Sequence, residues 1–365
     1  MSYSFGRSLR VQIFGQSHGE MIGCVIDGLP AGIKLDTDEI SAFMARRAPG
    51  RDANSTSRKE SDVPRIVSGL FDGYTCGAPL TAIIENSDHR SSDYGKLKDT
   101  PRPNHADFPA RIKYGGFADY RGGGAFSGRL TAPLCFAGAA AIQYLRMCGV
   151  DIGAHIYRIG GVTDTPFDPL GVKSETLKEI SSKPFPVISA EAEEKMKAVI
   201  GKARSFLDSV GGIVECAAVG VPAGIGEPRY DGIESAIASI CFGIPAVKGV
   251  EFGLGFGFGS SFGSDANDQM RVSDGDVVFD SNNCGGVTGG ISDGRPIIFR
   301  CAFKPTPSIA RPQTTADLNE MKTTTLEISG RHDPCVVHRA VPAVESAAAL
   351  AIADLMLAVN GNRHV

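Results

Sequence analysis

Apolar and polar residues alternate over short stretches of the first part of the chain, as in Leu9-Arg10-Val11-Gln12-Ile13-Phe14, and glycine-rich turns separate these stretches. An alternation with a period of two residues, bounded by turn residues, predicts β-strands. A helix is predicted near residues 38–46, and it ends in a basic run at a position where the helix dipole favours cations. The strands predicted in this part are residues 9–14, 21–26, 66–71 and 80–84.

The longest apolar stretch in the middle of the chain predicts a buried helix at residues 131–147, because apolar side chains occur nearly all round it. Ser189 is the expected N-cap of a helix from residue 190 to about residue 209. Gly and Phe alternate over residues 253–262, which favours phenylalanines packed at a tight strand over rings that stack on a ligand. The other predicted elements are strands at 152–159, 213–219 and 296–303 and a last helix at 342–358, ended by Asn360 and Gly361.

One ten-residue pattern occurs twice. Residues 24–33 and 216–225 share a strand followed by a Gly-x-Pro-Ala-Gly-Ile loop, 192 residues apart, and each copy precedes a predicted helix. No Pro/Ser/Gly linker and no block of like charge divides the chain. The repeat therefore predicts two similar halves within one domain that spans residues 1–365.

Composition narrows the class of protein. The chain of 365 residues is 42% hydrophobic and 21% charged, which is typical of globular proteins. Its net charge of -4 and pI near 6.0 argue against a dedicated nucleic-acid binder. The nine cysteines never form a C-x-x-C pair, and no His/Cys/Asp cluster has the spacing of metal ligands, so neither a disulfide framework nor a metal site is expected.

The chain is expected to be soluble and cytoplasmic. Its first residues contain no apolar signal-peptide segment, and its apolar runs are predicted to be too short to span a bilayer. No membrane partner is therefore expected.

Two glycine-rich stretches carry candidate binding chemistry. Residues 281–308 contain two diglycines and end in Lys304-Pro305-Thr306, a combination that suits an anionic, planar ligand such as a flavin phosphate. Residues 115–129 feed the N-terminus of the predicted buried helix, which is a natural anion site, and Arg121 and Arg129 add positive charge.

The candidate catalytic residues are two histidines in loops. His18 and His105 lie in Gly- and Pro-punctuated segments, where a titratable group can reach a ligand. Asp333 is a candidate base, although a turn or a salt bridge would also explain an aspartate at this position. Arginines suited to phosphate or carboxylate gather near glycine-rich turns. They are Arg47, Arg51, Arg102, Arg121, Arg129 and Arg331.

Three collinear motifs resemble the signatures of the chorismate synthase family. The first is Gly15-Gln16-Ser17-His18-Gly19 with Gly28-Leu29-Pro30, the second runs from Arg121 to Arg129, and the third begins at Gly330-Arg331-His332-Asp333-Pro334-Cys335. Residues 102–107, 246–251 and 304–306 also fit, and the resemblance covers residues 5 to 358.

The resemblance implies a fold and a reaction. The fold would be a layered α+β body, with helices between two antiparallel sheets and an internal pseudo-two-fold, assembled as a homotetramer. The reaction would be the trans-1,4 elimination of phosphate from 5-enolpyruvylshikimate-3-phosphate to give chorismate, which needs reduced FMN without net redox change. NADPH would serve as a reductant of the flavin in some members, and the absence of an added segment favours an external reductant here.

The resemblance also implies residue roles. His18, with Ser17 nearby, would act on the leaving phosphate, His105 on the reduced flavin, and Asp333 would help to remove the ring hydrogen. The residues expected to hold substrate are Arg47, Arg51, Arg102, Arg129 and Arg331. The residues expected to contact FMN are Ala125, Phe126, Ser127, Pro245, Ala246, Gly289, Lys304, Pro305, Thr306, Pro307, Ser308 and Arg331.

The chain departs from the family pattern at Gln16, Ala48, Ala53, Asn104 and Ala125. The alanines at 48 and 53 stand where arginines are expected near the substrate phosphate, which leaves Arg46 or Arg51 as the substitute cation.

Two other functions fit part of the sequence. An FMN/NADPH oxidoreductase would bind flavin and turn over NADPH. A non-catalytic binder of phosphorylated ligands or RNA would use the basic cluster at residues 46–59, and its binding would be strongly salt-dependent.

Overall fold

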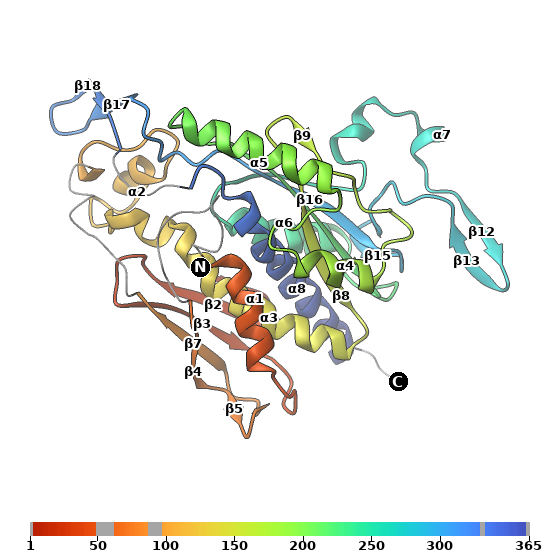
Figure 1. Ribbon diagram of the computed structural model, residues 1–365. Helices are drawn as coiled ribbons and strands as arrows, with labels where there is room; N and C mark the ends of the chain where they lie inside the picture. The colour runs from red at the N-terminus through yellow and green to blue at the C-terminus, as the bar shows by residue number, and fades with distance from the viewer. Residues whose placement is uncertain (1–2, 49–61, 87–96, 329–332, 363–365) are drawn as a thin grey trace.

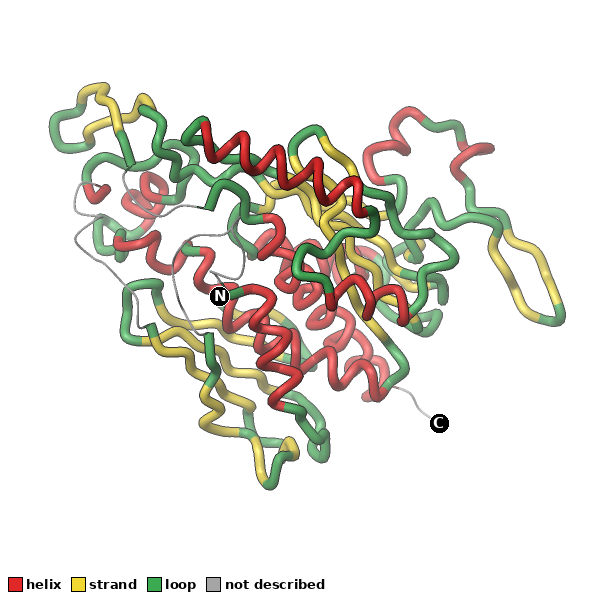
Figure 2. The backbone as a smooth tube through the Cα atoms, in the orientation of Figure 1, coloured by secondary structure: helices red, strands yellow, loops and turns green. Residues whose placement is uncertain are grey.

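Two five-stranded antiparallel sheets enclose a layer of helices in the computed structural model of the chain, which describes residues 3–48, 62–86, 97–328 and 333–362 (Figure 1). Figure 2 shows this layer of helices, in red, between the two groups of strands, in yellow. The first sheet contains, in spatial order, β1 (Ser4–Phe5), β2 (Arg10–Gly15), β3 (Met21–Asp27), β7 (Leu80–Glu85) and β4 (Arg65–Ser68). The second contains β11 (Val247–Phe252), β16 (Ile297–Phe303), β10 (Gly212–Val219), β8 (Asp151–Ile159) and β9 (Val162–Thr163). The predicted α+β fold is confirmed.

The two sheets have the same internal order. The central strand of the first sheet is β3, between β2 and β7, and that of the second is β10, between β8 and β16. A helix follows each central strand, α1 (Thr37–Arg47) after β3 and α6 (Ile233–Gly243) after β10, and a longer helix closes each half, α3 (Thr131–Met147) and α8 (Val337–Asn362). Each half therefore contains a strand, the repeated loop and a helix in that order, as the repeated pattern in the sequence predicts, and the structure extends the likeness to two further strands and a closing helix.

The repeated loop makes the same hydrogen bonds in both halves. The Thr75 hydroxyl accepts from the backbone N–H of Ile33 at 2.9 Å and donates to the carbonyl of the loop proline at 2.6 Å. In the second half the Ser292 hydroxyl accepts from Ile225 at 2.9 Å and donates to the equivalent proline carbonyl at 2.6 Å. A hydroxyl from a distant segment thus closes both loops in the same way.

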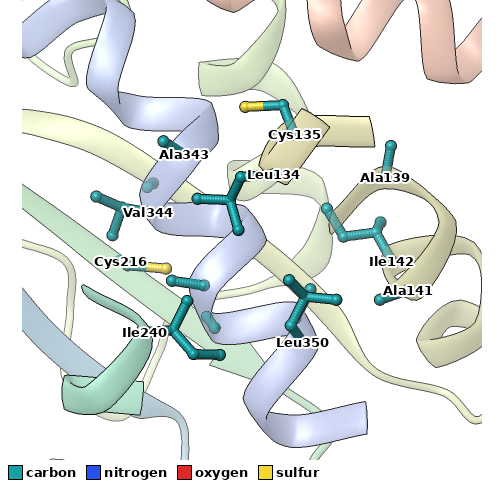
Figure 3. Close-up of a cluster of buried hydrophobic side chains, with 14 of the residues drawn as sticks. Leu134, Cys135, Ala139, Ala141, Ile142, Cys216, Ile240, Ala343, Val344 and Leu350 are labelled. Carbon is teal, nitrogen blue, oxygen red and sulfur yellow. The ribbon is translucent and has the colours of Figure 1, made fainter. Parts of the chain in front are cut away.

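Helices α3 and α8 cross at the centre of the molecule, where one apolar cluster joins both halves. Figure 3 shows Leu134 and Ile142 of α3 beside α8, which carries Val344 and Leu350, and Ile240 of α6 near the same helix. The two helices come so close that a Cβ added at Gly138 would lie 2.2 Å from Cβ of Ser346.

Helix α8 begins five residues before the predicted start, so that Pro342 lies inside it. The segment Val337–Val359 is long and apolar enough to cross a membrane, contrary to the sequence-based expectation, but 94% of its apolar window is buried inside the structure. The helix also continues to Asn362, through Asn360 and Gly361, which the sequence predicts as its end.

Two other strand predictions, both in segments that contain glycine, are wrong. The strand expected at 66–71 breaks at Gly69, whose φ of +91° separates β4 from β5 (Leu70–Phe71). The Gly/Phe stretch is not a strand: it contains the 3₁₀ helix η5 (Gly255–Ser260), and Phe256 and Phe262 are 86% and 78% exposed.

The strands β12 (Met270–Ser273) and β13 (Asp276–Phe279) form a ribbon that projects from the body (Figure 1). On the outer side of the second sheet lie α4 (Ser174–Ser182) and α5 (Ala190–Ser205), and Ser189 caps α5 as predicted by accepting from the N–H of Ala192. The remaining short elements are β6 (Tyr74–Thr75), α2 (Asp107–Lys113), η2 (Arg121–Phe126), η3 (Gly128–Leu130), η4 (Arg229–Asp231), α7 (Gly263–Ala266), β14 (Val287–Thr288), β15 (Ile291–Ser292), β17 (Gln313–Asp317) and β18 (Lys322–Leu326).

Candidate active site

A cavity of about 610 Å³ lies where loops from both halves meet the first turns of α8. This volume is within the range of pockets that hold small molecules and cofactors. Most of the residues predicted from the sequence line it. These are Ser17, His18, Arg47, Arg102, His105, Ala125, Phe126, Ser127, Arg129, Pro245, Ala246, Lys304, Thr306, Pro307, Ser308 and Asp333.

Other predicted residues lie elsewhere. Gly289 is exposed in the turn between β14 and β15 and does not line this cavity, and neither does Pro305. Arg51 and Arg331 fall outside the described residues. Arg46, considered as a substitute cation, does not line the cavity but makes two hydrogen bonds to the buried carboxylate of Glu345, at 2.6 and 2.8 Å.

The glycines that shape the cavity are Gly122 and Gly123. Both have positive φ, +58° and +89°. A Cβ at Gly122 would lie 2.1 Å from Cε1 of His18, and a Cβ at Gly123 would lie 3.2 Å from Cε1 of His105. Gly122 therefore leaves no room for a side chain beside His18, and a side chain at Gly123 would crowd His105.

The glycines of residues 281–290 have a different role from the predicted one. Instead of forming a ligand cradle, Gly285 packs against Gly253 and Ile298, and a Cβ at Gly286 would lie 2.4 Å from a backbone oxygen. Of the stretch 281–308, the cavity lining contains only residues from 303 onwards.

His18 is held by the loop that contains these glycines. The hydroxyl of Ser17 lies 3.2 Å from Nδ1 of His18 and donates to the carbonyl of Arg121 at 3.2 Å. The N–H of Ser17 donates to the carbonyl of Gly124 at 3.2 Å. Ser17 therefore fixes both the loop and the neighbouring imidazole.

His105 belongs to a group of three side chains that share hydrogen bonds. The carboxylate of Asp107 accepts from Arg102 through Nε at 2.7 Å and Nη2 at 2.8 Å, and it lies 2.6 Å from Nδ1 of His105. Burial lowers the pKa of His105, and the charge of Arg102 also lowers it, against the opposing effect of Asp107. Burial alone would raise the pKa of Asp107, but its hydrogen bonds to Arg102 and His105 bring it well below the usual value.

Two buried arginines meet at one carboxylate. Arg47, from the last turn of α1, and Arg129, from η3, both form ion pairs with Asp62. Arg47 also donates to the hydroxyl of Thr131 at 3.1 Å, and Arg129 to the amide oxygen of Asn86 at 3.1 Å. The site thus holds two guanidinium groups in fixed directions at one wall of the cavity.

Another part of the cavity lining could hold an anionic cofactor. The Lys304 backbone N–H donates to the carbonyl of Ala246 at 2.9 Å. Burial lowers the pKa of the Lys304 ammonium, and the neighbouring charge of Lys248 lowers it further. The Thr306 hydroxyl is buried and has no hydrogen-bond partner among the described residues, so it is a polar group that a bound ligand would satisfy.

Asp333 lies shortly before the N-terminus of α8 and accepts a hydrogen bond from Nη1 of Arg339 at 2.5 Å. The Nε of Arg339 donates to the backbone carbonyl of Arg47 at 3.0 Å. The alternative raised from the sequence, a salt bridge, is therefore present, but Asp333 also lines the cavity.

Sequence reasoning missed several residues of the site. Asp107 belongs to the motif at residues 102–107, and its place at the start of a helix, shortly after Arg102 and His105, was an available signal. Asp62 carried no local signal, because it pairs with Arg47 and Arg129 from other elements, and Arg339 was missed because its contact with the carbonyl of Arg47 spans 292 residues. Lys248 belongs to the motif at 246–251, but its effect on Lys304 depends on the tertiary structure. Across the described ranges, no group of three or more His, Cys, Asp or Glu could hold a metal ion.

Comparisons with known proteins agree on one family. Residues 9–357 match a family model described as chorismate synthase. A chorismate synthase of Pyrococcus abyssi is 51% identical over 353 residues, which cover 96% of this chain and 97% of the relative. A chorismate synthase of Korarchaeum cryptofilum is 46% identical over 354 residues and 96% of each chain. A solved crystal structure of chorismate synthase superimposes with a TM-score of 0.75 at 28% identity, covering 98% of this chain and 94% of that one.

Proposed function

The chain belongs to the chorismate synthase family, and from this membership we propose how its cavity carries out the reaction of that family. The protein is a carbon–oxygen lyase of the shikimate pathway, which leads to the aromatic amino acids. It eliminates phosphate from 5-enolpyruvylshikimate-3-phosphate to give chorismate. The observation that carries the proposal is that His18, His105 and Asp333 line the same cavity as three buried arginines.

The arginines suit this substrate, which bears a phosphate and two carboxylates. Arg47 and Arg129 have guanidinium groups that converge on one carboxylate, that of Asp62. We assign them to an anionic group of the substrate, because guanidinium binds phosphate and carboxylate in the same planar way. Arg102 lines the same cavity, held by Asp107. Arg51 and Arg331 stay in the proposed substrate set on the resemblance alone.

Reduced FMN fits the other part of the cavity. Lys304, Thr306 and Ser308 would hold its polar groups, with the backbone at 125–127 and 245–246, and the unsatisfied Thr306 hydroxyl supports this placement. When bound, reduced FMN supplies the electron-rich ring that assists loss of phosphate. Gly289 and Pro305 keep their proposed contacts from the resemblance, not from this cavity.

The acid–base groups are assigned by their neighbours. His18, oriented through Ser17, delivers a proton to the leaving phosphate or stabilises its charge. His105 is held through Asp107 at the glycine loop, on the side of the cavity proposed for the flavin. Asp333 acts as the base that assists removal of the ring hydrogen.

Three further properties are part of the proposal. The chain forms one domain over residues 1–365, supported by the apolar cluster that joins both halves. It is cytoplasmic, as expected for a biosynthetic enzyme whose cysteines are free thiols. It assembles as a homotetramer, supported by large exposed apolar side chains on η5 and the β12–β13 ribbon.

The test is an anaerobic assay with 5-enolpyruvylshikimate-3-phosphate and dithionite-reduced FMN, in which phosphate and chorismate are both measured. We expect equal amounts of the two products with reduced FMN and none with oxidised FMN. Oxidised FMN with NADPH should also give none, because we propose that the reductant is external. Net consumption of NADPH without chorismate would favour the oxidoreductase, and tight binding of phosphorylated ligand without turnover would favour the non-catalytic binder.

A further inference from the structure

We infer that Arg339 is a positioning residue. It holds the proposed base, Asp333, in a fixed position relative to the C-terminal end of α1, where Arg47 is proposed to bind substrate. This inference rests on the proposed function of Asp333. It gives a role to a side chain that none of the sequence motifs singled out.

The geometry is a two-point contact by one guanidinium. Nη1 of Arg339 donates to Oδ2 of Asp333 at 2.5 Å, and Nε donates to the backbone carbonyl of Arg47 at 3.0 Å. The side chains of Arg339 and Asp333 are only 15% and 13% exposed, so solvent screens the ion pair less than it would a surface pair.

The second contact falls on a special backbone group. Arg47 is the last residue of α1, and the last carbonyls of a helix have no partner within the helix. A cation at this position is also favoured by the helix dipole. Arg339 therefore binds the end of α1, and the side chain of that same Arg47 lines the cavity.

The contact joins the two halves of the molecule across the site. Helix α1 belongs to the first half, whereas Asp333 and Arg339 belong to the segment that begins α8, at the end of the second. A shift between the halves would move Asp333 relative to Arg47. Arg339 opposes this shift because its Nη1 and Nε bind one group on each side. Because a misplacement of about 1 Å can reduce turnover about 100-fold, such a link matters for catalysis.

The first experiment is a double-mutant cycle with Arg339→Gln and Asp333→Asn, assayed with reduced FMN. We expect R339Q to lower kcat by about 10- to 100-fold, with a smaller change in KM. We expect the Kd for reduced FMN and the Tm to stay close to those of the unsubstituted protein. In the D333N background, R339Q should change kcat by no more than about 2-fold, since residues that act as a unit are not additive.

Arg339→Lys separates charge from geometry. Lysine keeps the positive charge but lacks the planar fork that contacts two groups at once, so R339K should lie between the wild type and R339Q. If R339Q fails to fold, R339K takes its place in the double-mutant cycle with D333N. Arg146→Gln is the matched control, because Arg146 pairs with Glu39 and Asp151 outside the cavity, and its kcat should not change.

The outcomes separate this inference from the proposed function. If D333N lowers turnover strongly but measurably, and R339Q costs the same factor with and without Asp333, Arg339 acts independently and the inference is wrong. If D333N leaves turnover unchanged, the proposed base is wrong and the inference fails with it. Loss of Tm and FMN binding together in R339K, with kcat per folded molecule unchanged, would leave Arg339 a structural residue and also overturn the inference.

Discussion

At the scale of single residues, the site depends on partners that orient the reactive groups. Asp107 is an example, because one carboxylate fixes both Arg102 and His105. Because an ionised carboxylate only accepts hydrogen bonds, Nδ1 of His105, 2.6 Å from Asp107, carries the proton that this carboxylate accepts. Nη2 of Arg102, 3.1 Å from the same nitrogen, is then a neighbour and not a donor to it. In the neutral ring the other nitrogen, Nε2, is then an acceptor, so Asp107 determines which nitrogen of His105 can take up a proton.

Asp107→Asn should lower kcat by about 10-fold or more, while His105→Ala should lower it by about 10²- to 10⁴-fold. Because Asp107 raises the pKa of His105 against burial, the NMR titration midpoint of His105 should fall further below about 6.5 in the variant. Asp99→Asn is the control. Nη1 of Arg111 lies 2.7 Å from Oδ1 of Asp99, and neither residue lines the cavity. An unchanged kcat in D107N would contradict the role of Asp107.

Gly122→Ala should lower kcat per folded molecule, beyond any loss of folded protein that the substitution causes. The added Cβ would meet His18 at 2.1 Å, and the positive φ adds about 1–2 kcal/mol of backbone strain. Gly73→Ala imposes the same kind of strain, at φ +81°, with no atom within 4 Å of the new Cβ. Comparable losses of kcat per folded molecule in both variants would show that strain, not displacement of His18, causes the effect.

At the scale of elements, the crossing of α3 and α8 sets the distance between the two halves. Gly138→Ala should destabilise the protein by about 1–3 kcal/mol, because the added methyl overlaps Ser346 in a packed interior. Gly201→Ala, on α5 with open space around it, should instead stabilise by about 0.5–1 kcal/mol. Denaturant unfolding of both variants tests the pair, and equal signs would contradict the packing argument.

The second sheet contains a buried histidine that the proposed mechanism does not use. Nδ1 of His155 lies 3.1 Å from Asp164, Nε2 lies 2.9 Å from Glu215, and Arg300 also binds Glu215 at 2.8 Å. Burial alone would lower the pKa of His155, but the two carboxylates outweigh it and raise the pKa, while the pKa values of Asp164 and Glu215 are lowered.

This cluster predicts a pH-dependent stability. A raised histidine pKa stabilises the fold below the unfolded value, about 6.5, and the contribution disappears as pH rises through the folded value. The two carboxylates, whose pKa values are lowered in the fold, contribute their full stabilisation above about pH 4, the unfolded value. The Tm difference between wild type and His155→Gln should therefore be largest between about pH 4.5 and 6.5 and shrink toward pH 9. A difference that grows with pH would contradict a protonated His155.

At the scale of the whole molecule, the projecting β12–β13 ribbon is suited to contact another subunit. Val272 and Val277 are directly opposite each other and are 75% and 62% exposed. Arg295 anchors the base of the ribbon through Asp268 at 2.8 Å and Asp293 at 2.6 Å.

Val272→Asp with Val277→Asp should therefore dissociate the proposed tetramer in sedimentation velocity, because it places like charges on an apolar contact surface. Thr323→Asp, on the polar β17–β18 ribbon, is the control and should leave the assembly unchanged. A tetramer that persists in the double variant would place the interface elsewhere.

The sequence by itself determined the family, the buried helix at 131–147, the repeated loop and most residues that line the cavity. These features are local: each depends on a motif, a cap or a periodicity within a few residues. The motifs around His18, His105 and Asp333 carry enough information because the chemistry of the reaction restricts which residues can serve there.

Only the tertiary structure decided which residues support that chemistry. Arg339 contacts the backbone of residue 47, 292 positions away, and Arg129 meets the carboxylate of Asp62 from another element. The same applies to the glycines: Gly122 and Gly123 face the histidines, whereas Gly289 lies on the surface outside the cavity. Such contacts depend on how two similar halves pack around α3 and α8, and that packing is set by the whole core, not by any local pattern.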